Sequence, residues 1–495
     1  MRLILSLVVL IVLPYASWAS AEDWPMRGRS RDHNPVSLEQ GAPLDWQIHS
    51  DEHKPRNIRW SVSTSGYAFG GPVVANGLVW SGGSNSNPLV PSVNGDRGVL
   101  ACFRESDGKF LYQYTASRLA KYTNDWPMNG LSGSPLIERG RLWFITNRRE
   151  VVCLDIAALQ RGDGPAKELW KYDLVAEHGV VPASPQIHWH DTVGSVAIHN
   201  DLLFVPTGNG VAVDHPGATK IKAPQSPAIV CLRKDDGMLV WKDHSAGDTG
   251  YGGHHASPLV VETSGEVQVI HPQADGWVRS YAAECGKLVW QFDTNYKEGK
   301  WDWTSHERSK SVVTATPVFA DGRVYFAQGR DHEFRKKFGR MFCIDPTRRG
   351  DISPELDDGQ GRGKPNPNSG LIWEFTNQTG DPSARLEETN ASAAVAAGLV
   401  IIPDASGKVH CLDAITGHRY WAHDLSAQVF GDPLIVDRKI YVGDDNGNVT
   451  VFKLSKTLEL LATREMNQQI ISPPVFANKT LYIQTMSTLH AIQER

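Results

Sequence analysis

Apolar and polar residues alternate along most of this chain in short runs that return at intervals. Three of these runs, Cys102–Tyr112, Cys231–Trp241 and Cys411–Trp421, read CFRESDGKFLY, CLRKDDGMLVW and CLDAITGHRYW. Each shows the period of two expected of a β-strand, then a turn with a glycine, then a second strand that ends in an aromatic residue. The pattern predicts a chain built from β-hairpins.

A further strand pair precedes each hairpin, so the repeating unit has four strands. The pair opens at a Ser/Thr-Pro-like signal and bends at a tight polar turn, as in TPVFADGRVYFAQ and DPLIVDRKIYVGD. Four-stranded units repeated along a chain are typical of a β-propeller. Eight units are expected, beginning near Gly71, Ser134, Ser184, Ser257, Thr316, Ala393, Asp432 and Pro473.

The two end segments complete one another. The last unit, from Pro473 onward, supplies three strands, and Asn57–Ser63 (NIRWSVS) has the form of the missing outer strand. Pairing the two would close the ring and remove the exposed edges of an open array. We therefore expect an all-β fold, a single eight-bladed propeller over residues 57–495, preceded by a leader segment at 22–56.

Residues 1–21 have the pattern of a signal peptide. Arg2 precedes an apolar run, Leu3–Leu13, and Ala19–Ala21 supplies the small residues that a signal peptidase needs. The run is too short to span a bilayer comfortably, so no transmembrane anchor is expected in the mature chain. The sequence predicts an exported protein, periplasmic or secreted, whose mature form starts at Glu22.

Composition narrows the classes of function. A formal net charge of −5 and the lack of a basic stripe argue against nucleic acid, whose phosphates attract clustered lysine and arginine. The length would suggest about three domains, but a repeat spreads one continuous core around a ring. We expect one domain and a monomer.

The six cysteines of this chain invite a disulfide framework, but the repeat register argues against one. Five fall at one equivalent position of the hairpin, which Ser280, Val451 and Ala491 occupy in the other units. Such a position is a small buried site, and equivalent sites in different blades should usually lie too far apart for a disulfide. Free, buried thiols without a metal are predicted at Cys102, Cys153, Cys231, Cys343 and Cys411, with Cys285 alone in a turn.

The outer strands carry an aromatic residue at one recurring place. We interpret these residues as packing each blade against its neighbour, rather than as stacking platforms for a sugar or a quinone. They are Trp60, Tyr112, Trp170, Trp241, Trp290, Trp373 and Trp421.

The unit, with its Cys-Leu-Asp strand, its Thr-Gly turn and its outer-strand tryptophan, resembles the repeat of the quinoprotein propellers, which bind pyrroloquinoline quinone (PQQ). The resemblance covers the chain after Asn57 and implies an eight-bladed ring. The same repeat serves PQQ-dependent dehydrogenases and cofactor-free scaffolds, such as the outer-membrane assembly lipoprotein. Fold alone therefore does not decide between an enzyme and a scaffold.

The resemblance implies where a dehydrogenase would hold Ca²⁺ and the quinone. Asn209, in FVPTGNG, falls where that family places a calcium-binding asparagine. Asn147 lies near the place of the family's calcium-binding glutamate, and Glu150 follows three residues later. Gly82–Gly83 stands where that family has adjacent cysteines that form a disulfide lid over the cofactor.

The family's catalytic aspartate has no firm counterpart. Asp248 could substitute for it in the corresponding loop, and a Trp-Asp-Trp with Asp302 occurs one blade later. We therefore expect a binding or scaffold protein without bound quinone or metal. The alternative is a PQQ- and Ca²⁺-dependent oxidoreductase of alcohols or sugars, with Asn209 on the metal and Asp248 or Asp302 as the base. Carbohydrate recognition or turnover is a third option, although sequence alone places no carboxylate pair at glycosidase separation.

Unusual residues gather in loops that propeller topology puts on one face. Connections from each outer strand to the next inner strand lie beside the loops between second and third strands, and several of both kinds are long and rich in Trp, His, Asp, Arg and Glu. Binding residues are commonly carried on loops held by a rigid scaffold. We expect a protein or glycan partner on this face, near the mouth of the central channel.

Ten residues in these connections are candidate ligand contacts. His254 and His255 would chelate one metal ion only in an irregular loop, because neighbours on a strand point to opposite sides. The tryptophan-rich cluster pairs flat apolar surfaces with polar groups, as sugar and quinone pockets do, or is a lid that packs on its neighbour. Arg385 either contacts a ligand or belongs, with two glutamates, to a solvated or mutually paired charge set. The candidates are Asp125, Trp126, Asn129, His254, His255, Trp301, Trp303, His306, Arg308 and Arg385.

Two further segments stand outside the repeat. Residues 346–370 form an insertion on the opposite face, and their Gly, Pro and charge content is that of a mobile surface loop. In the leader, Trp24 and Arg27 are candidates to pack against the ring.

Overall fold

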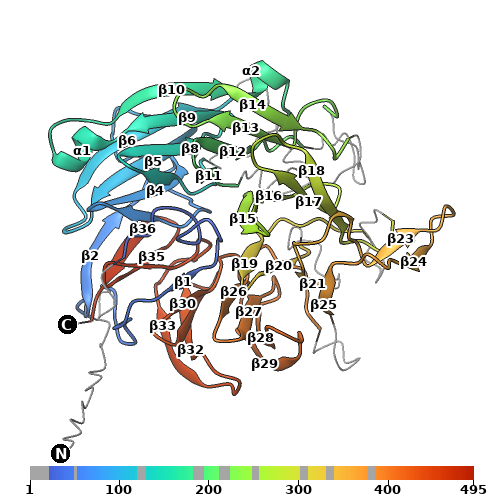
Figure 1. Ribbon diagram of the computed structural model, residues 1–495. Helices are drawn as coiled ribbons and strands as arrows, with labels where there is room; N and C mark the ends of the chain where they lie inside the picture. The colour runs from blue at the N-terminus through green and yellow to red at the C-terminus, as the bar shows by residue number, and fades with distance from the viewer. Residues whose placement is uncertain are drawn as a thin grey trace, which may run out of the picture.

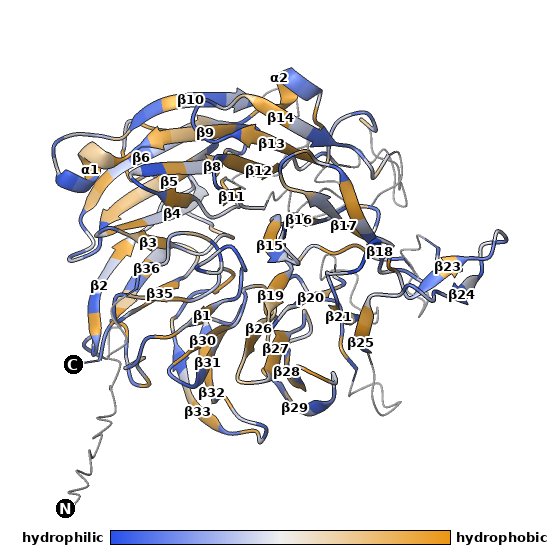
Figure 2. Ribbon diagram, viewed as in Figure 1, coloured by the Kyte–Doolittle hydropathy of each residue, from blue (hydrophilic) through white to orange (hydrophobic). Residues whose placement is uncertain are grey.

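The computed structural model describes residues 22–49, 53–119, 130–181, 194–210, 223–247, 256–300, 310–329, 339–376 and 385–494. These residues form eight antiparallel blades around a central axis (Figure 1). Apolar residues concentrate on the strands within the blades and polar residues on the turns (Figure 2), so the core lies between neighbouring blades. The predicted all-β, eight-bladed propeller is confirmed.

Each blade runs from an inner to an outer strand. Blades 1 to 4 comprise β3 (Val73–Ala75), β4 (Leu78–Ser84), β5 (Arg97–Arg104) and β6 (Phe110–Ser117); β7 (Leu136–Glu138), β8 (Arg141–Ile145), β9 (Glu150–Asp155) and β10 (Lys167–Asp173); β11 (Ala197–His199), β12 (Leu202–Pro206), β13 (Ile229–Arg233) and β14 (Leu239–Asp243); β15 (Leu259–Thr263), β16 (Glu266–Pro272), β17 (Trp277–Ala282) and β18 (Leu288–Asp293). Blades 5 to 8 comprise β19 (Val318–Ala320), β20 (Arg323–Ala327), β21 (Met341–Ile344) and β25 (Leu371–Phe375); β26 (Ala394–Ala396), β27 (Leu399–Pro403), β28 (Lys408–Asp413) and β29 (Arg419–Asp424); β30 (Leu434–Val436), β31 (Lys439–Gly443), β32 (Asn448–Lys453) and β33 (Leu460–Glu465); β34 (Val475–Ala477), β35 (Thr480–Gln484), β36 (Thr488–Ile492) and β2 (Ile58–Ser63). Two short helices, α1 (Ala157–Arg161) and α2 (Leu174–His178), flank the outer strand of blade 2.

The ring closes as the sequence predicts. β2 pairs antiparallel with β36, with Trp60 opposite Ala491 and Ser63 opposite Thr488. The outer strand of blade 8 is thus supplied by a segment that precedes blade 1.

The predicted start of the third blade is wrong. Ser184 lies outside the described residues, and the inner strand β11 begins at Ala197. Ser195 takes the place that the repeat reserves for a small hydroxyl residue, because its side chain accepts a hydrogen bond from the backbone of Ser134, 2.9 Å away. Its own backbone N–H donates to Ser257 Oγ, also at 2.9 Å. These links between inner strands, rather than the Ser-Pro pair at 184–185, mark where a blade begins.

The recurring tryptophans join successive blades, as predicted. In five blades the indole N–H donates to a backbone carbonyl in the next blade's turn between its third and fourth strands. Four of these five turns contain a glycine with φ of about +70°. A Cβ added to that glycine would lie 2.6–2.9 Å from the tryptophan ring. Glycine suits these turns for two reasons. It adopts the left-handed backbone without strain, and it has no Cβ to collide with the neighbouring blade's indole. The tryptophan and glycine pairs are Trp60 with Gly108, Trp170 with Gly237, Trp241 with Gly286 and Trp373 with Gly417.

The cysteines are free, as expected. Cys102, Cys153, Cys231, Cys343 and Cys411 are buried, and Cys285 is exposed. Each buried cysteine pairs across its hairpin with the outer-strand aromatic, and Ser280, Val451 and Ala491 occupy the same register in the other blades. Burial raises the pKa of four of these thiols to about 12, which leaves them protonated and unreactive near neutral pH.

The leader makes one turn around the inside of the ring. Its contacts follow the order of the blades: Glu22 meets blade 8, Trp24 blade 1, Pro25 blade 2, Arg31 blades 3 and 4, Asp32 blade 5, Asn34 blade 6, and Val36 blade 7. Within it, β1 (Val36–Ser37) adds a parallel strand to the inner edge of β30. Trp24 is buried and Arg27 pairs with Asp432, so both leader candidates do pack against the ring.

After this turn the leader fills a gap between blades 7 and 8. Blade 7 lacks the outer-strand tryptophan, because Ala462 stands opposite Val451. Trp46 of the leader, 2% exposed, joins the core shared by Val451, Met466 and the strands of blade 8. Its indole N–H lies 3.2 Å from Met466 Sδ. The leader thus supplies the aromatic side chain that this blade is missing.

The insertion at 346–370 is ordered, contrary to the expectation from its composition. β22 (Gly350–Asp351) pairs in parallel with β18 on the outer edge of blade 4, and Ile352 is fully buried beside it. β23 (Glu355–Asp357) and β24 (Gly363–Pro365) form a hairpin that projects from the rim (Figure 1). Burial of Ile352 and pairing of β22 with the free edge of β18 hold this segment in place, although it is rich in glycine and charged residues.

A buried histidine in the leader makes the stability of the ring depend on pH. Burial, and next the charge of Arg27, lowers the pKa of His33 to about 3. The unfolded chain takes up this proton near pH 6.5 and the folded protein does not, so stability is lost as the pH falls below 6.5. We expect the free energy of unfolding to drop by about 2 kcal/mol for this residue between pH 7 and pH 5. Denaturant titrations of wild type and His33→Gln at both pH values measure it, and equal pH slopes for the two proteins would contradict it.

Candidate functional site

Backbone hydrogen bonds join the two kinds of loop that the sequence assigns to one face. In six blades the connection that enters the blade exchanges a backbone hydrogen bond with the turn between its second and third strands. These bonds place both kinds of loop on the same face, as the sequence predicts. They run from the N–H groups of Ser84, Gly210, Gly329, Ala405, Asp445 and Met486 to the carbonyls of Tyr67, Val181, Val312, Glu388, Gln428 and Gln469.

Most residues predicted as ligand contacts lie outside the described residues. This holds for Asp125, Trp126, Asn129, His254, His255, Trp301, Trp303, His306 and Arg308, and for Asp248 and Asp302. Arg385 is described, and its Nη2 lies 3.6 Å from Glu387 Oε1. Burial and the nearby Asp404 raise the pKa of Glu387, and the Arg385 charge opposes that rise. The neighbouring Glu388 accepts a 2.5 Å hydrogen bond from Ser311 Oγ, and ligand contact by Arg385 stays a prediction.

Asn209 is held by the protein rather than presented to a ligand. The residue is 1% exposed, its Oδ1 accepts from the Val181 N–H at 3.2 Å, and its Nδ2 donates to the Ala223 carbonyl at 3.0 Å. The buried guanidinium of Arg149 lies against the adjacent Gly208, where an added Cβ would be 2.7 Å from Nε. A calcium site needs converging oxygens, and here a cationic side chain abuts the loop that would bind the ion.

The other residues of the implied calcium site lie against other groups of the protein. The amide oxygen of Asn147 faces Gly98 of blade 1, where an added Cβ would lie 2.5 Å from it. Glu150 pairs with Arg148 at 3.5 Å and with Lys171 at 3.3 Å. The described residues contain no group of three or more His, Cys, Asp or Glu placed to hold a metal ion. These side chains do not fit a bound Ca²⁺.

Close backbone packing explains why Gly83, in the Gly82–Gly83 pair that replaces the cysteine lid, has no side chain. An added Cβ at Gly83 would lie 2.7 Å from the Tyr67 carbonyl, and the Gly83 carbonyl accepts from the Leu131 N–H at 3.1 Å. Blade 1 therefore brings its backbone into contact with both neighbouring connections at this point. A side chain on Gly83 would collide with that backbone.

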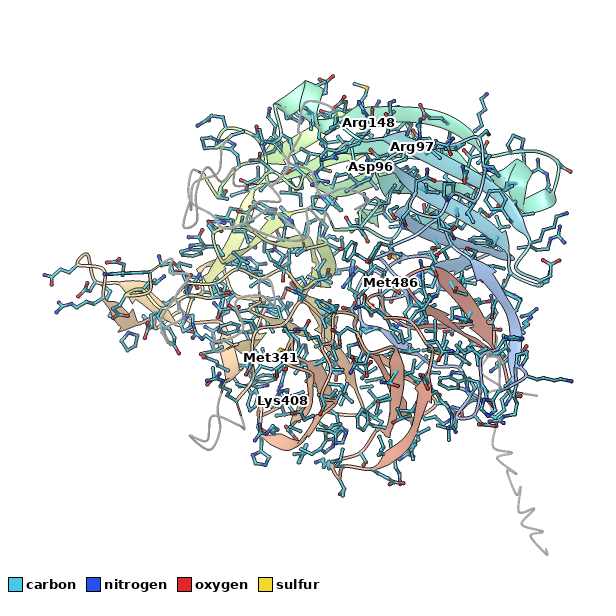
Figure 3. All side chains as sticks on the ribbon, turned by 180° about the vertical axis from the view of Figure 1, so that it is seen from behind. Asp96, Arg97, Arg148, Met341, Lys408 and Met486 are labelled. Carbon is cyan, nitrogen blue, oxygen red and sulfur yellow. The ribbon has the colours of Figure 1, made fainter. Side chains whose placement is uncertain are left out.

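A groove of about 530 Å³ opens on the loop-rich face over blades 7, 8 and 1. Met486, one of its lining residues, lies near the middle of the ring in Figure 3. The lining combines carboxamide and hydroxyl groups with one carboxylate and two larger side chains. The lining residues are Tyr67, Ser86, Asp445, Asn446, Asn467, Gln468, Gln469, Met486 and Ser487.

Sequence reasoning found the face but missed this groove. The predicted contacts came from the connections into blades 2, 4, 5 and 6, where charged and aromatic residues are conspicuous. The groove is built mainly by short turns, together with the long loop between β4 and β5 that carries Ser86, and its residues are ordinary for turns. The run Asn467–Gln469 between blades 7 and 8, with Tyr67 in the next connection, was the available signal.

Comparisons with known proteins agree with the fold. The sequence model of the PQQ_2 family, described as outer membrane protein assembly factor BamB, matches residues 365–491. No curated protein matches the sequence significantly. Neither α1 nor α2 has the length and hydropathy that a bilayer span requires, and they are the helices among the described residues.

Three solved structures illustrate the range of proteins that share this ring. BamB from Moraxella catarrhalis is 15% identical with a TM-score of 0.55, covering 88% of this chain and 97% of its own. Quinohemoprotein alcohol dehydrogenase from Comamonas testosteroni is 12% identical with a TM-score of 0.63, covering 97% and 82%. Sqt1 from Saccharomyces cerevisiae is 12% identical with a TM-score of 0.54, covering 89% and 99%. At these identities the likeness concerns the fold alone, which is a β-propeller, and the PQQ_2 family model matches only its C-terminal part at 365–491.

Proposed function

We propose that this protein is a binding or scaffold propeller that receives a partner on its loop-rich face and works without a bound quinone. The observation that carries the proposal is the Arg149 guanidinium packed against Gly208, next to an Asn209 whose amide is tied to the backbone. In the resembling enzymes that asparagine would bind Ca²⁺ beside the quinone. A buried cation in this position disfavours a second cation by Coulomb repulsion.

The architecture supports a binding role in a second way. The leader circles the inside of the ring and its side chains are bonded to blades 3, 4, 6, 7 and 8. The leader therefore stabilises the ring from its inner side, while a groove stays open on the loop-rich face. A braced ring that presents loops at one face is suited to hold a partner without large rearrangement.

The proposal predicts that the purified chain from Glu22 onward binds no PQQ, with or without Ca²⁺. Isothermal titration calorimetry with both ligands, on wild type and Asn209→Ala, measures this directly. We expect no heat of binding in either protein. Calcium-dependent binding that is lost in Asn209→Ala would refute the proposal and favour the oxidoreductase alternative.

A further inference from the structure

We propose that the groove over blades 7, 8 and 1 binds a neutral oligosaccharide. This rests on the proposed function, because it assigns a ligand class to the face given to binding there. The chemistry of the nine lining residues supports it, since they offer many neutral hydrogen-bonding groups, little charge and little apolar wall.

Charge excludes the ionic ligand classes. Asp445 is the one charged side chain among the lining residues, and its Oδ1 already accepts from the Gln428 N–H at 2.7 Å. No lysine or arginine lines the groove, so a phosphate or carboxylate ligand would meet no opposite charge. Met486 and Tyr67 are too few to bury a largely apolar ligand. A neutral, polar ligand remains.

The free polar groups match those of a sugar. The carboxamides of Asn446, Asn467 and Gln469 make no hydrogen bond to any other described residue. Each carboxamide both donates and accepts, and so does each hydroxyl of a sugar. Tyr67 is 38% exposed and offers an aromatic face with a polar edge beside these amides.

The walls of the groove are fixed before any ligand arrives. Gln468 Oε1 accepts from Thr485 Oγ1 at 2.7 Å and from Ser487 Oγ at 2.9 Å, which ties the connection into blade 8 to the turn of that blade. Gly66 lies so close to Ser86 that an added Cβ would be 2.2 Å from its hydroxyl. Preformed walls reduce the entropy lost on binding.

The same geometry argues against an extended peptide. Such peptides commonly add to a strand edge through main-chain hydrogen bonds. Part of the backbone in this groove is already bonded within the protein, as with Met486 N–H to the Gln469 carbonyl and Thr64 N–H to the Ser487 carbonyl. Among the described residues, the groove is lined by turns and presents no strand edge to a peptide, so its side chains are the main recognition groups, as they are for sugars.

The test is a microarray of neutral oligosaccharides, followed by calorimetry of the best tetrasaccharide with the chain from Glu22 onward. Variants are Tyr67→Ala, Tyr67→Phe and Gln469→Ala, and the matched control is Gln360→Ala on the exposed hairpin loop between β23 and β24. We expect Tyr67→Ala and Gln469→Ala to weaken binding about tenfold, equivalent to about 1.4 kcal/mol. Tyr67→Phe, which keeps the ring, should stay within about threefold of wild type. The control should match wild type.

Three results would overturn the inference. They are no binding to any neutral glycan at millimolar concentration, binding that Tyr67→Ala and Gln469→Ala leave unchanged, and displacement of the sugar by peptides with higher affinity at the same groove. None of these results requires PQQ to bind, so the calorimetry with PQQ and Ca²⁺ distinguishes failure of this inference from failure of the proposed function.

Discussion

Replacing Trp46 with alanine is expected to lower the free energy of unfolding by about 3–5 kcal/mol. The side chain is 2% exposed and lies in the core between blades 7 and 8, where Ala462 leaves the place of the usual outer-strand tryptophan empty. Removing the indole would open a cavity at the junction where the ring closes. The strands β31 and β32, whose Tyr441 and Val451 line this core, are paired on both sides, so they cannot collapse to fill it.

The measurement is a denaturant titration followed by far-ultraviolet circular dichroism, because the substitution also changes tryptophan fluorescence. Leu38→Ala in the same leader is the control, since Leu38 is 65% exposed and its loss should change stability by less than about 0.5 kcal/mol. Trp46→Phe should recover part of the loss. A penalty below 1 kcal/mol for Trp46→Ala would mean that the leader does not occupy this position in solution.

Arg27→Met is expected to cost about 3 kcal/mol of stability. Arg27 Nη2 lies 2.7 Å from Asp432 Oδ2 and 3.1 Å from Ser392 Oγ, and the Asp432 side chain is 5% exposed. The substitution keeps the aliphatic stem but leaves a buried carboxylate without its cation. Asp432 then retains only the Ser392 N–H as a charge-stabilising donor among the bonds described, at 2.7 Å.

Arg29→Met is the matched control for this ion pair. Arg29 lies 2.7 Å from Glu22, but both side chains are about one quarter to one third exposed. Solvent screens such a pair, so its loss should cost less than about 1 kcal/mol. Adding Asp432→Asn to Arg27→Met should restore part of the stability, because it removes the unpaired charge and keeps an acceptor for Ser392. Equal penalties for Arg27→Met and Arg29→Met would show that burial does not strengthen the Arg27 pair.

The repeat made the blades predictable from sequence. Period-two strands, turn glycines and outer-strand tryptophans are local signals, and the shared register of Cys411 and Val451 follows from counting between them. The one misplaced blade shows the limit of that method. A Ser-Pro pair at 184–185 imitates a start signal, whereas the true start at Ser195 is selected by hydroxyl contacts with inner strands of two other blades.

The candidate site was predictable only as a face. Topology alone assigns loops to one side of a ring, and the backbone bonds between connections and turns confirm that assignment. The groove itself joins Tyr67 to Gln469, residues about 400 positions apart, through the closure of the ring. No sequence pattern records that neighbourhood, because the residues involved are common in turns.

The sequence by itself determined the strand pattern, the number of blades, the closing strand at Asn57–Ser63 and the buried, unpaired cysteines, since each depends on spacing within one repeat. The tertiary structure decided the path of the leader, the use of Trp46 in blade 7, the order of the 346–370 insertion and the position of the groove. These features depend on contacts such as Trp46 with Met466, which are 420 residues apart. Their free energy comes from burial and pairing that exist only once the ring has closed.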